Sequence, residues 1–279
     1  PKAKLKPNET VYGYLQGKRH IDRDVIDRFE VTAHKTNKDL IVFPFFNEFG
    51  KLVFVKYRNL NPTKKDGSKA PKEWCEKDCE PVLFGMNQAT NYEEPLIITE
   101  GQIDSLSVAT AGFENATSVP IGCNGFTWIQ NCWDWLRRFE TVIVFGDNEH
   151  GKITLVEDIR ARFPTGITVK AVRSIDYLGE KDANDILVNF GKEAIITAIA
   201  NAEEPEIPRL KEMADVKTVD LNSLEKIKTE IEEIDKVIGG FCMGQVILLT
   251  GKRGEGKSTL ASQFGCAALD QGRRLMIYS

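Results

Sequence analysis

Short apolar runs alternate with longer segments through the middle of this 279-residue chain. The runs hold four or five residues, many of them β-branched, and end on Gly or acidic residues, which is typical of buried parallel strands. We predict such strands at residues 96–99, 142–145 and 168–172, and a further strand that leads into a Gly/Asn turn at 119–126. Helices are predicted between and after them, at residues 104–111, 128–139, 155–163 and 193–202. Alternating strands and helices of this length predict an α/β unit.

The N-terminal part of the chain has a different pattern. Residues 22–29 place apolar side chains on one helical face and predict a short helix. Two apolar runs at residues 39–46 and 51–58 flank Asn47-Glu48-Phe49-Gly50, which has turn composition, so a β-hairpin is predicted. Pro44 places the first of these strands at an edge or a bulge. An α+β subdomain is therefore predicted ahead of the α/β unit.

The C-terminal part begins after an acidic, Pro-broken stretch at residues 202–208, where we place a domain boundary. Residues 220–238 predict an amphipathic helix, because apolar residues recur there three and four positions apart: Leu221, Leu224, Ile227, Ile231 and Ile234. Residues 245–250 predict a strand, and a helix is predicted to begin at about Lys257.

Composition limits the function classes. The chain is 42% apolar and 28% charged, and its formal net charge of −4 means that any nucleic acid must be contacted through local basic patches. No apolar run approaches the roughly 20 residues that a membrane span needs. No secretory signal precedes the fold, and six scattered cysteines suggest reduced thiols, so we expect a cytoplasmic protein and no membrane partner. The missing initiator Met suggests a fragment.

Acidic residues follow the predicted strands. Glu100 and Asp104 lie in Glu-Gly-Gln-Ile-Asp, Asp147 and Glu149 in Asp-Asn-Glu, and Asp182 in Lys-Asp-Ala-Asn-Asp. Ligands of such sheets sit outside the carboxyl ends of the strands. Several carboxylates at one sheet edge repel one another unless divalent cations neutralise them, and hard oxygen ligands suit Mg²⁺ or Mn²⁺. Asp104 follows Glu100 by four positions, so we expect it on the same helix face, supporting the site.

A phosphate-binding loop follows the predicted strand at residues 245–250. Its sequence, Gly-Lys-Arg-Gly-Glu-Gly-Lys-Ser, matches Gly-x-x-x-x-Gly-Lys-Ser in a strand–loop–helix context. Backbone N–H groups and a helix N-terminus cradle phosphates in such loops, the lysine neutralises them and the serine holds Mg²⁺. The residues expected to bind ATP are Gly251, Gly254, Gly256, Lys257 and Ser258.

Basic residues gather between residues 51 and 72. A solvated basic loop is the simpler interpretation, and the alternative is a surface for triphosphates or template phosphates. The spacing Cys75-x-x-x-Cys79 invites a zinc interpretation, but no second Cys or His pair is available, so we expect no zinc in this chain.

These motifs resemble the toprim domain of primases and topoisomerases, and Lys-Asp-Ala-Asn-Asp is similar to the third acidic motif of phage-type primase-helicases and their mitochondrial helicase relatives. Lys56-Tyr57-Arg58 and Leu83-Phe84-Gly85 also match that family. One departure is Asp-Asn-Glu in place of Asp-x-Asp, which makes Asp147 a better candidate ligand than Glu149. The Gly-Gly-Phe-x-x-Gly-Gln approach to the phosphate-binding loop looks like a RecA-like ring ATPase.

The resemblance implies synthesis of short RNA primers from ribonucleoside triphosphates on single-stranded DNA. It makes Glu100, Asp147 and Asp182 the catalytic acids. Mg²⁺ or Mn²⁺ ions would lower the pKa of the attacking 3′-hydroxyl and steady the leaving pyrophosphate. The expected metal ligands are the five acids named above: Glu100, Asp104, Asp147, Glu149 and Asp182. The expected nucleotide- or DNA-binding residues are Lys56, Arg58, Lys64 and Lys65.

The resemblance also implies a domain layout. Residues 1–92 would form the N-terminal basic subdomain of a primase core, 93–202 the toprim domain, 203–219 a linker, and 220–279 a linker helix with a truncated RecA-like P-loop domain. The sequence ends before a Walker B acid, so we expect no helicase activity from this chain. In related ring helicases the helix after the linker packs on the neighbouring subunit; packing on its own domain is the alternative.

Two other functions stay open. Mitochondrial relatives keep this fold without primase activity, as a DNA-binding and ring-stabilising module, although the retained acids argue against that here. A toprim nuclease or topoisomerase is the second alternative, and nothing in the sequence suggests the separate Tyr domain that a topoisomerase needs.

Overall fold

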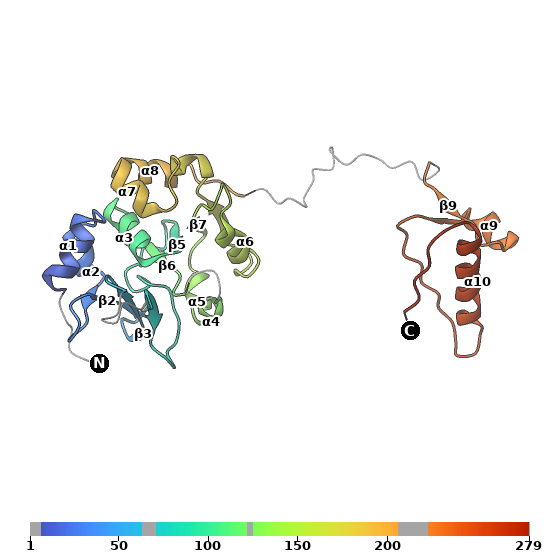
Figure 1. Cartoon of the computed structure of the whole chain (residues 1–279), viewed down its shortest axis with the longest axis horizontal. Helices are drawn as coiled ribbons and strands as arrows, with labels where there is room; N and C mark the ends of the chain where they lie inside the picture. The colour runs from blue at the N-terminus through green and yellow to red at the C-terminus, as the bar shows by residue number, and fades with distance from the viewer. Residues whose placement is uncertain (1–6, 63–70, 122–124, 206–222, 279) are drawn as a thin grey trace. The chain divides into compact units, whose positions relative to one another are not determined.

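Four parallel strands lie at the centre of the first of the two units into which the chain divides, residues 1–206 and 207–279 (Figure 1). The computed structural model describes residues 7–62, 71–121, 125–205 and 223–278. The predicted turn at residues 122–124 and most of the predicted linker lie outside these ranges, and so do Lys64 and Lys65.

The parallel sheet has the strand order β6-β5-β7-β8. Its strands are β5 (Leu96–Thr99), β6 (Ala116–Ser118), β7 (Thr141–Phe145) and β8 (Thr168–Ala171). The helices that follow or connect them are α3 (Gln102–Thr110), α6 (Thr154–Arg160), α7 (Ala183–Phe190) and α8 (Lys192–Ala200). Mixed α/β architecture with a parallel sheet is therefore confirmed. All four residues of β5 are buried, because helices cover both faces of such a sheet.

Two predictions for this part of the chain were wrong: one strand was placed too late, and one helix was predicted too long. The strand predicted at residues 119–126 lies earlier, at β6, because Pro120 has no N–H to continue the ladder; the last bond is from Val119 N to Thr99 O at 3.0 Å. The helix predicted at residues 128–139 is two short helices, α4 (Thr127–Asn131) and α5 (Trp133–Leu136). Cys132 separates them with φ −102° and ψ 5°, outside the helical region.

Helix α3 is buried along its whole length. Every residue from Gln102 to Thr110 is buried, since α2 (Arg23–Arg28), α7 and the sheet all pack against it. Both of its serine hydroxyls are satisfied within the helix: Ser105 Oγ donates to Gln102 O, and Ser107 Oγ donates to Ile103 O. Hydrogen bonding of this kind removes most of the cost of burying a hydroxyl.

The N-terminal segment forms an antiparallel sheet with two helices. The sheet has the order β1-β2-β3-β4, with strands β1 (Thr32–Ala33), β2 (Leu40–Phe46), β3 (Leu52–Asn59) and β4 (Glu73–Cys75), preceded by α1 (Glu9–Gly17) and α2. The predicted hairpin is confirmed as β2 and β3. Pro44 lies beyond the two residues that pair with β1, one residue before a register shift at Phe45/Phe46, so no ladder bond is lost on that side.

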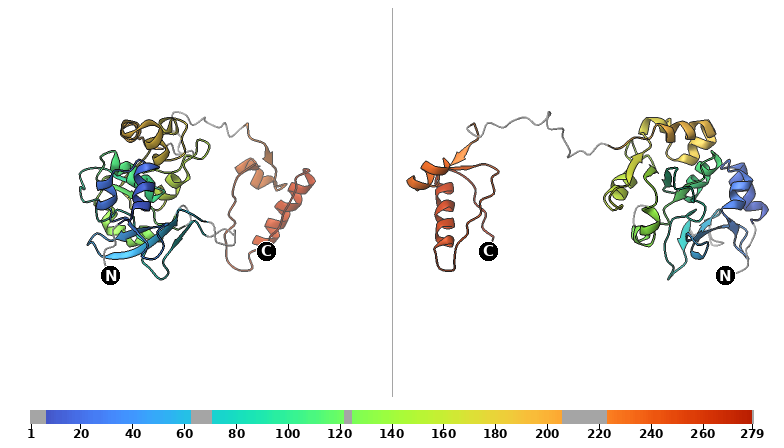
Figure 2. Two further views of the ribbon diagram at one scale, coloured as in Figure 1. Left: turned by 60° about the vertical axis from the view of Figure 1, so that its left-hand side comes forward. Right: turned by 180° about the vertical axis from the view of Figure 1, so that it is seen from behind.

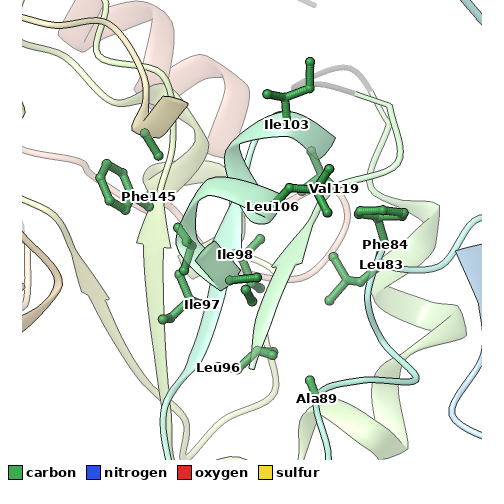
Figure 3. Close-up of a cluster of buried hydrophobic side chains, with 14 of the residues drawn as sticks. Leu83, Phe84, Ala89, Leu96, Ile97, Ile98, Ile103, Leu106, Val119 and Phe145 are labelled. Atoms are coloured by element: carbon green, nitrogen blue, oxygen red, sulfur yellow. The ribbon is translucent and has the colours of Figure 1, made fainter. Parts of the chain in front are cut away.

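Phe84 joins the two sheets. Its backbone N and O exchange hydrogen bonds with Ser118 at the end of β6, at 2.9 and 3.2 Å. Its ring, fully buried, lies 5.3 to 5.7 Å from the rings of Phe29, Phe43 and Phe45 of the N-terminal segment. Figure 3 shows Leu83 and Phe84 beside the buried side chains of β5 and α3. In all views the antiparallel sheet lies at one end of this unit and α7 and α8 at the other (Figures 1 and 2).

The second unit contains β9 (Lys226–Ile227), α9 (Glu232–Ile238), β10 (Phe241–Cys242) and α10 (Lys257–Asp270). The single helix predicted over residues 220–238 is wrong in its described part. Glu230 has φ +60°, and the carboxylate of Asp235 accepts hydrogen bonds from Thr229 N and Oγ1, so the helix starts only after a turn. Residues 220–222 lie outside the description.

The strand predicted at residues 245–250 is also absent from the described unit. Val246 and Leu248 are 94% and 84% exposed, and no described segment pairs with this stretch. A strand needs neighbours for its backbone groups, so sequence propensity alone does not form one. Among the described helices, none is long and apolar enough to cross a membrane.

Phe84→Ala is expected to destabilise the protein by about 3–5 kcal/mol, because it leaves a cavity where three rings meet. The measurement is urea unfolding followed by tryptophan fluorescence. Phe49→Ala is the matched control, since Phe49 is 84% exposed and its loss should change stability by less than about 0.5 kcal/mol. Equal midpoints for the two variants would contradict the role given to Phe84.

Candidate metal centre

The carboxyl ends of β5 and β7 bring the first two acidic segments together. These strands are parallel neighbours, and Thr99 pairs with Phe145, so the residues that follow leave the sheet side by side. The main-chain N of Asp147 donates to Glu100 Oε2 at 3.4 Å. Two segments that are 47 positions apart in sequence thereby share one sheet edge.

The third acidic segment reaches the same edge at the start of α7. Asp182 is the N-cap of this helix, and its side chain accepts a hydrogen bond from Asp185 N at 2.8 Å. The second and third segments are joined directly, because Asn148 N donates to Lys181 O at 2.7 Å. Local helix capping and a loop contact therefore determine where Asp182 lies.

Three carboxylates meet at this edge. Asp104, Asp147 and Asp182 each offer an oxygen, and these oxygens all lie within 4.8 Å of one another. Burial, together with the carboxylates of Asp182 and Asp147, raises the pKa of Asp104 well above its ordinary value. Burial, with Asp185 and Asp147 nearby, also raises the pKa of Asp182. The cluster is thus short of positive charge.

Two features hold the Asp104 carboxylate in place. Asn184 N donates to its Oδ1 at 3.0 Å. On the other side, the lack of a side chain at Gly101 leaves room for the Asp104 carboxylate, because a Cβ at position 101 would collide with Asp104 Oδ2. This collision is a physical reason for the Gly in Glu-Gly-x-x-Asp.

Lys181 is the cation nearest to the second acidic segment. Its Nζ lies 2.8 Å from Asp147 Oδ2 and 3.9 Å from Glu149 Oε1. The hydrogen bond and charge of Asp147 raise the pKa of Lys181. Sequence reasoning did not select this residue, although its place beside Asp182 in Lys-Asp-Ala-Asn-Asp could have indicated it.

The five acids predicted as metal ligands do not lie in equivalent positions. Asp104, expected to support the site, is a member of the central cluster. Glu100 precedes α3, and its carboxylate meets the cluster only by accepting a hydrogen bond from Asp147 N. The expectation that Glu100 and Asp104 share a helix face is wrong, because α3 begins at Gln102. The Glu149 side chain is 66% exposed and lies at the rim.

The cluster fits a hard divalent cation. Its donors are carboxylate oxygens, and one of the carboxylates, that of Asp104, is buried among like charges. Hard cations such as Mg²⁺ and Mn²⁺ take such ligands and relieve their mutual repulsion. The acidic trio therefore indicates the use of a divalent metal.

The predicted nucleotide-binding residues on β3 are engaged in ion pairs. Glu73 on β4 contacts Lys56 Nζ at 3.0 Å and Arg58 Nη1 at 2.9 Å. Burial alone would raise the pKa of Glu73, but Lys56 and Arg58 outweigh it and the pKa is lowered. Phosphates would have to compete with Glu73 for these two cations.

The two cysteines considered for zinc lie on and after β4. Cys75 ends this strand and Cys79 follows it, and both are free thiols.

The predicted phosphate-binding loop of the second unit runs into α10. Gly251, Gly254 and Gly256 all have positive φ, and Gly256 is the N-cap of the helix. Lys257 Nζ donates to Gly251 O at 2.7 Å, and the Glu255 carboxylate accepts from Lys252 N at 2.6 Å. Lys257 and Ser258 form the first turn of α10, so all five predicted residues belong to one loop and helix start.

Asp104→Asn is expected to stabilise the metal-free protein by on the order of 1 kcal/mol, or about 2–4 °C in melting temperature. Because the folded carboxyl has the higher pKa, its ionisation costs stability as pH rises above its ordinary value of 3.8. An amide carries no charge, and its Oδ1 can still accept from Asn184 N. The measurement is thermal unfolding in EDTA at pH 5 and pH 7.5, where the gain should be larger at pH 7.5.

The matched control for this test is Asp158→Asn, which removes a surface carboxylate paired with Arg162 in an i,i+4 arrangement. It should leave the melting temperature within about 1 °C of the wild type. Mn²⁺ should stabilise the wild type and the control but not Asp104→Asn. A metal-free Asp104→Asn variant that melts below the wild type would contradict the interpretation.

Glu73→Gln is expected to make the chain less sensitive to acid. A carboxyl with a lowered folded pKa stabilises the protein above its ordinary pKa of 4.5, and this stabilisation is lost as pH falls through the folded value. The wild type should therefore lose more stability than Glu73→Gln between pH 6 and pH 3, as measured by urea midpoints. Parallel pH profiles for the two proteins would show that the Lys56–Glu73–Arg58 contacts contribute nothing measurable.

Comparison with known families divides the chain in the same way as the fold. Residues 97–187 match a Toprim-like family model, and residues 227–278 match the KaiC ATPase model. A primase homologue of Arabidopsis thaliana is 27% identical over 202 residues, which cover 66% of this chain and 57% of that protein. The Twinkle homolog protein, chloroplastic/mitochondrial, of the same plant is 26% identical over 202 residues, covering 66% of this chain and 27% of that protein. The chain thus spans about half or less of the length of these curated relatives.

Solved structures of primases share the fold. The Aquifex aeolicus primase, with its zinc-binding and RNA polymerase domains, matches with a TM-score of 0.57 and 19% identity, covering 71% of this chain and 57% of that one. The primase fragment of the bacteriophage T7 primase-helicase matches with a TM-score of 0.51 and 21% identity, covering 66% and 72%. A segment that matches a Toprim-like model and shares its fold with primases is followed in sequence by a segment that matches the KaiC ATPase model, and this combination is similar to that of primase-helicase-type proteins.

Proposed function

We propose that this chain is the primase portion of a replicative primase-helicase, which synthesises short RNA primers on single-stranded DNA from ribonucleoside triphosphates. The observation that carries the proposal is the acidic cluster of buried Asp104 and half-buried Asp147 and Asp182 at the carboxyl edge of a Toprim-like sheet. The similarity to a primase homologue of Arabidopsis thaliana, and the fold shared with the bacteriophage T7 primase fragment, support the same activity.

In this proposal Asp104, Asp147 and Asp182 hold Mg²⁺ or Mn²⁺, with Glu100 and Glu149 beside them. Bound metal would make the 3′-hydroxyl more acidic and neutralise the leaving pyrophosphate. Asn184 and Gly101 keep the Asp104 carboxylate oriented toward its partners. Lys181 forms an ion pair with Asp147, with Nζ 2.8 Å from Oδ2, and so holds this carboxylate at the sheet edge.

The remaining predicted residues take supporting roles. Lys56 and Arg58 would bind triphosphate or template phosphates by exchanging Glu73 for a phosphate oxygen, with Lys64 and Lys65 as further contacts. Gly251, Gly254, Gly256, Lys257 and Ser258 would bind ATP, and self-association into a ring would involve the ATPase segment. We place this activity in the cytoplasm of a bacterial or phage-infected cell.

One observation favours a second candidate, a catalytically inactive module that binds DNA and stabilises a helicase ring. Lys181 pairs with Asp147, Asn184 N donates to Asp104, and Asp182 caps α7, so each central acid already has a partner within the chain. In that case the acids would be structural and Mn²⁺ would not bind.

Ribonucleotide condensation separates the two candidates. The wild type, with single-stranded DNA, labelled ribonucleoside triphosphates and Mg²⁺ or Mn²⁺, is expected to form short products. Asp147→Ala should reduce them by at least about a hundredfold, because it removes a group that stabilises charge at the reacting atoms. Asp158→Ala, a surface acid on α6, is the matched control and should leave the yield unchanged.

Absence of products has to be read together with metal binding. Mn²⁺ binding by the wild type but not by Asp147→Ala, without products, would place the missing step in template recognition. No Mn²⁺ binding by the wild type would overturn the primase proposal in favour of the inactive module.

A further inference from the structure

An arginine from the N-terminal helices reaches the start of α7. Arg19 lies between α1 and α2, and its Nη1 donates to Asn184 Oδ1 at 3.0 Å across 165 positions of sequence. Asn184 returns the contact, since its Nδ2 donates to Arg19 O at 2.9 Å. Arg19 is itself held by Tyr14, whose hydroxyl accepts from Arg19 Nε at 3.1 Å. This paired contact defines both the position and the direction of the Asn184 side chain.

Asn184, held in this way, also contacts the acidic cluster. It is 1% exposed, and its Nδ2 donates to Ser107 Oγ on α3 at 2.9 Å as well as to Arg19. Its main-chain N donates to Asp104 Oδ1 at 3.0 Å. Every polar group of the side chain is therefore satisfied, and a buried amide with all its partners has one favourable arrangement.

A restraint is needed here because the acids repel one another. Asp104 on α3 and Asp182 at the start of α7 each offer a carboxylate oxygen, and these oxygens lie within 4.8 Å of each other. Like charges at this distance repel, so the two helices need contacts that hold them together. Asn184, two residues after Asp182, joins α7 to α3 through Asp104 and Ser107. Arg19 adds a positive charge 3.8 Å from Asp185 Oδ1 on the same helix turn.

We propose that Arg19 and Asn184 are positioning residues of the metal site. Arg19, in the N-terminal segment, holds Asn184, and Asn184 keeps Asp104 and Asp182 close enough together to bind one metal ion. The inference rests on the proposed function, because it assumes that the acidic cluster binds a divalent cation. Neither residue contacts a reacting group. The metal site then depends on Arg19, which lies near the start of the described chain and outside the Toprim-like match at residues 97–187.

The test has to separate positioning from charge. Loss of a positive charge beside carboxylates by itself strengthens cation binding, whereas loss of positioning weakens it. Arg19→Lys keeps the charge but replaces the two guanidinium nitrogens that donate to Tyr14 and Asn184 with a single ammonium nitrogen. Arg19→Gln removes the charge as well. Lys192→Gln is the matched control, because Lys192 on α8 pairs with Asp22 before α2 and so also links the N-terminal helices to the toprim helices, without a contact to the cluster.

The measurement is Mn²⁺ affinity of the full chain, from the electron paramagnetic resonance signal of free Mn²⁺, together with melting temperatures in EDTA. Arg19→Lys and Arg19→Gln are expected to weaken Mn²⁺ binding about tenfold, as partners of metal ligands do when they are lost. Lys192→Gln is expected to bind Mn²⁺ as the wild type does.

Three outcomes would overturn the inference. Unchanged binding by Arg19→Lys with tighter binding by Arg19→Gln would show that Arg19 acts only through its charge. Equal weakening by Lys192→Gln would show a general loosening of the helices. Absence of Mn²⁺ binding by the wild type would instead overturn the proposed function, and the inference with it.

Discussion

Mutual repulsion of carboxylates at one sheet edge is the constraint around which the first unit is arranged. Asp104 is buried and lies close to Asp147 and Asp182. Folding therefore removes one carboxylate from water and brings it near two others, which costs free energy. Local contacts oppose this repulsion: Asn184 N to Asp104, Lys181 to Asp147, and the helix cap formed by Asp182. These contacts hold the three carboxylates in an arrangement that suits a hard divalent cation.

The N-terminal segment contributes both apolar packing and polar restraint to this arrangement. Phe84 closes the edge of the parallel sheet at Ser118 and packs against rings of the antiparallel sheet, so one continuous core underlies both predicted subdomains. Arg19 links the same segment to Asn184. The basic strand β3 belongs to this segment, and its cations are neutralised by Glu73 in the same way as Asp147 is by Lys181. Internal ion pairs therefore occupy the groups that a substrate or metal would contact.

Sequence patterns failed where a periodic signal had no packing to support it. Leu224, Ile227, Ile231 and Ile234 have helical spacing, yet the positive φ of Glu230 and the hydrogen bonds of Asp235 divide the segment into a strand and a short helix. Residues 245–250 have strand composition but no described partner strand. In contrast, the hairpin of β2 and β3 formed as predicted, because its turn and both of its strands are close in sequence.

The sequence by itself determined the α/β class, the hairpin, the acidic motifs and the glycine-rich loop that runs into α10, because each depends on a short stretch with a strong local signal. Only the tertiary structure decided which acids meet. It placed Asp104 in the central cluster, left Glu149 at the rim, and brought Lys181 and Arg19 to the site. Those outcomes depend on strand order and helix packing, which bring together residues far apart in sequence. Spacing along a chain carries no information about such contacts until the sheet edge is known.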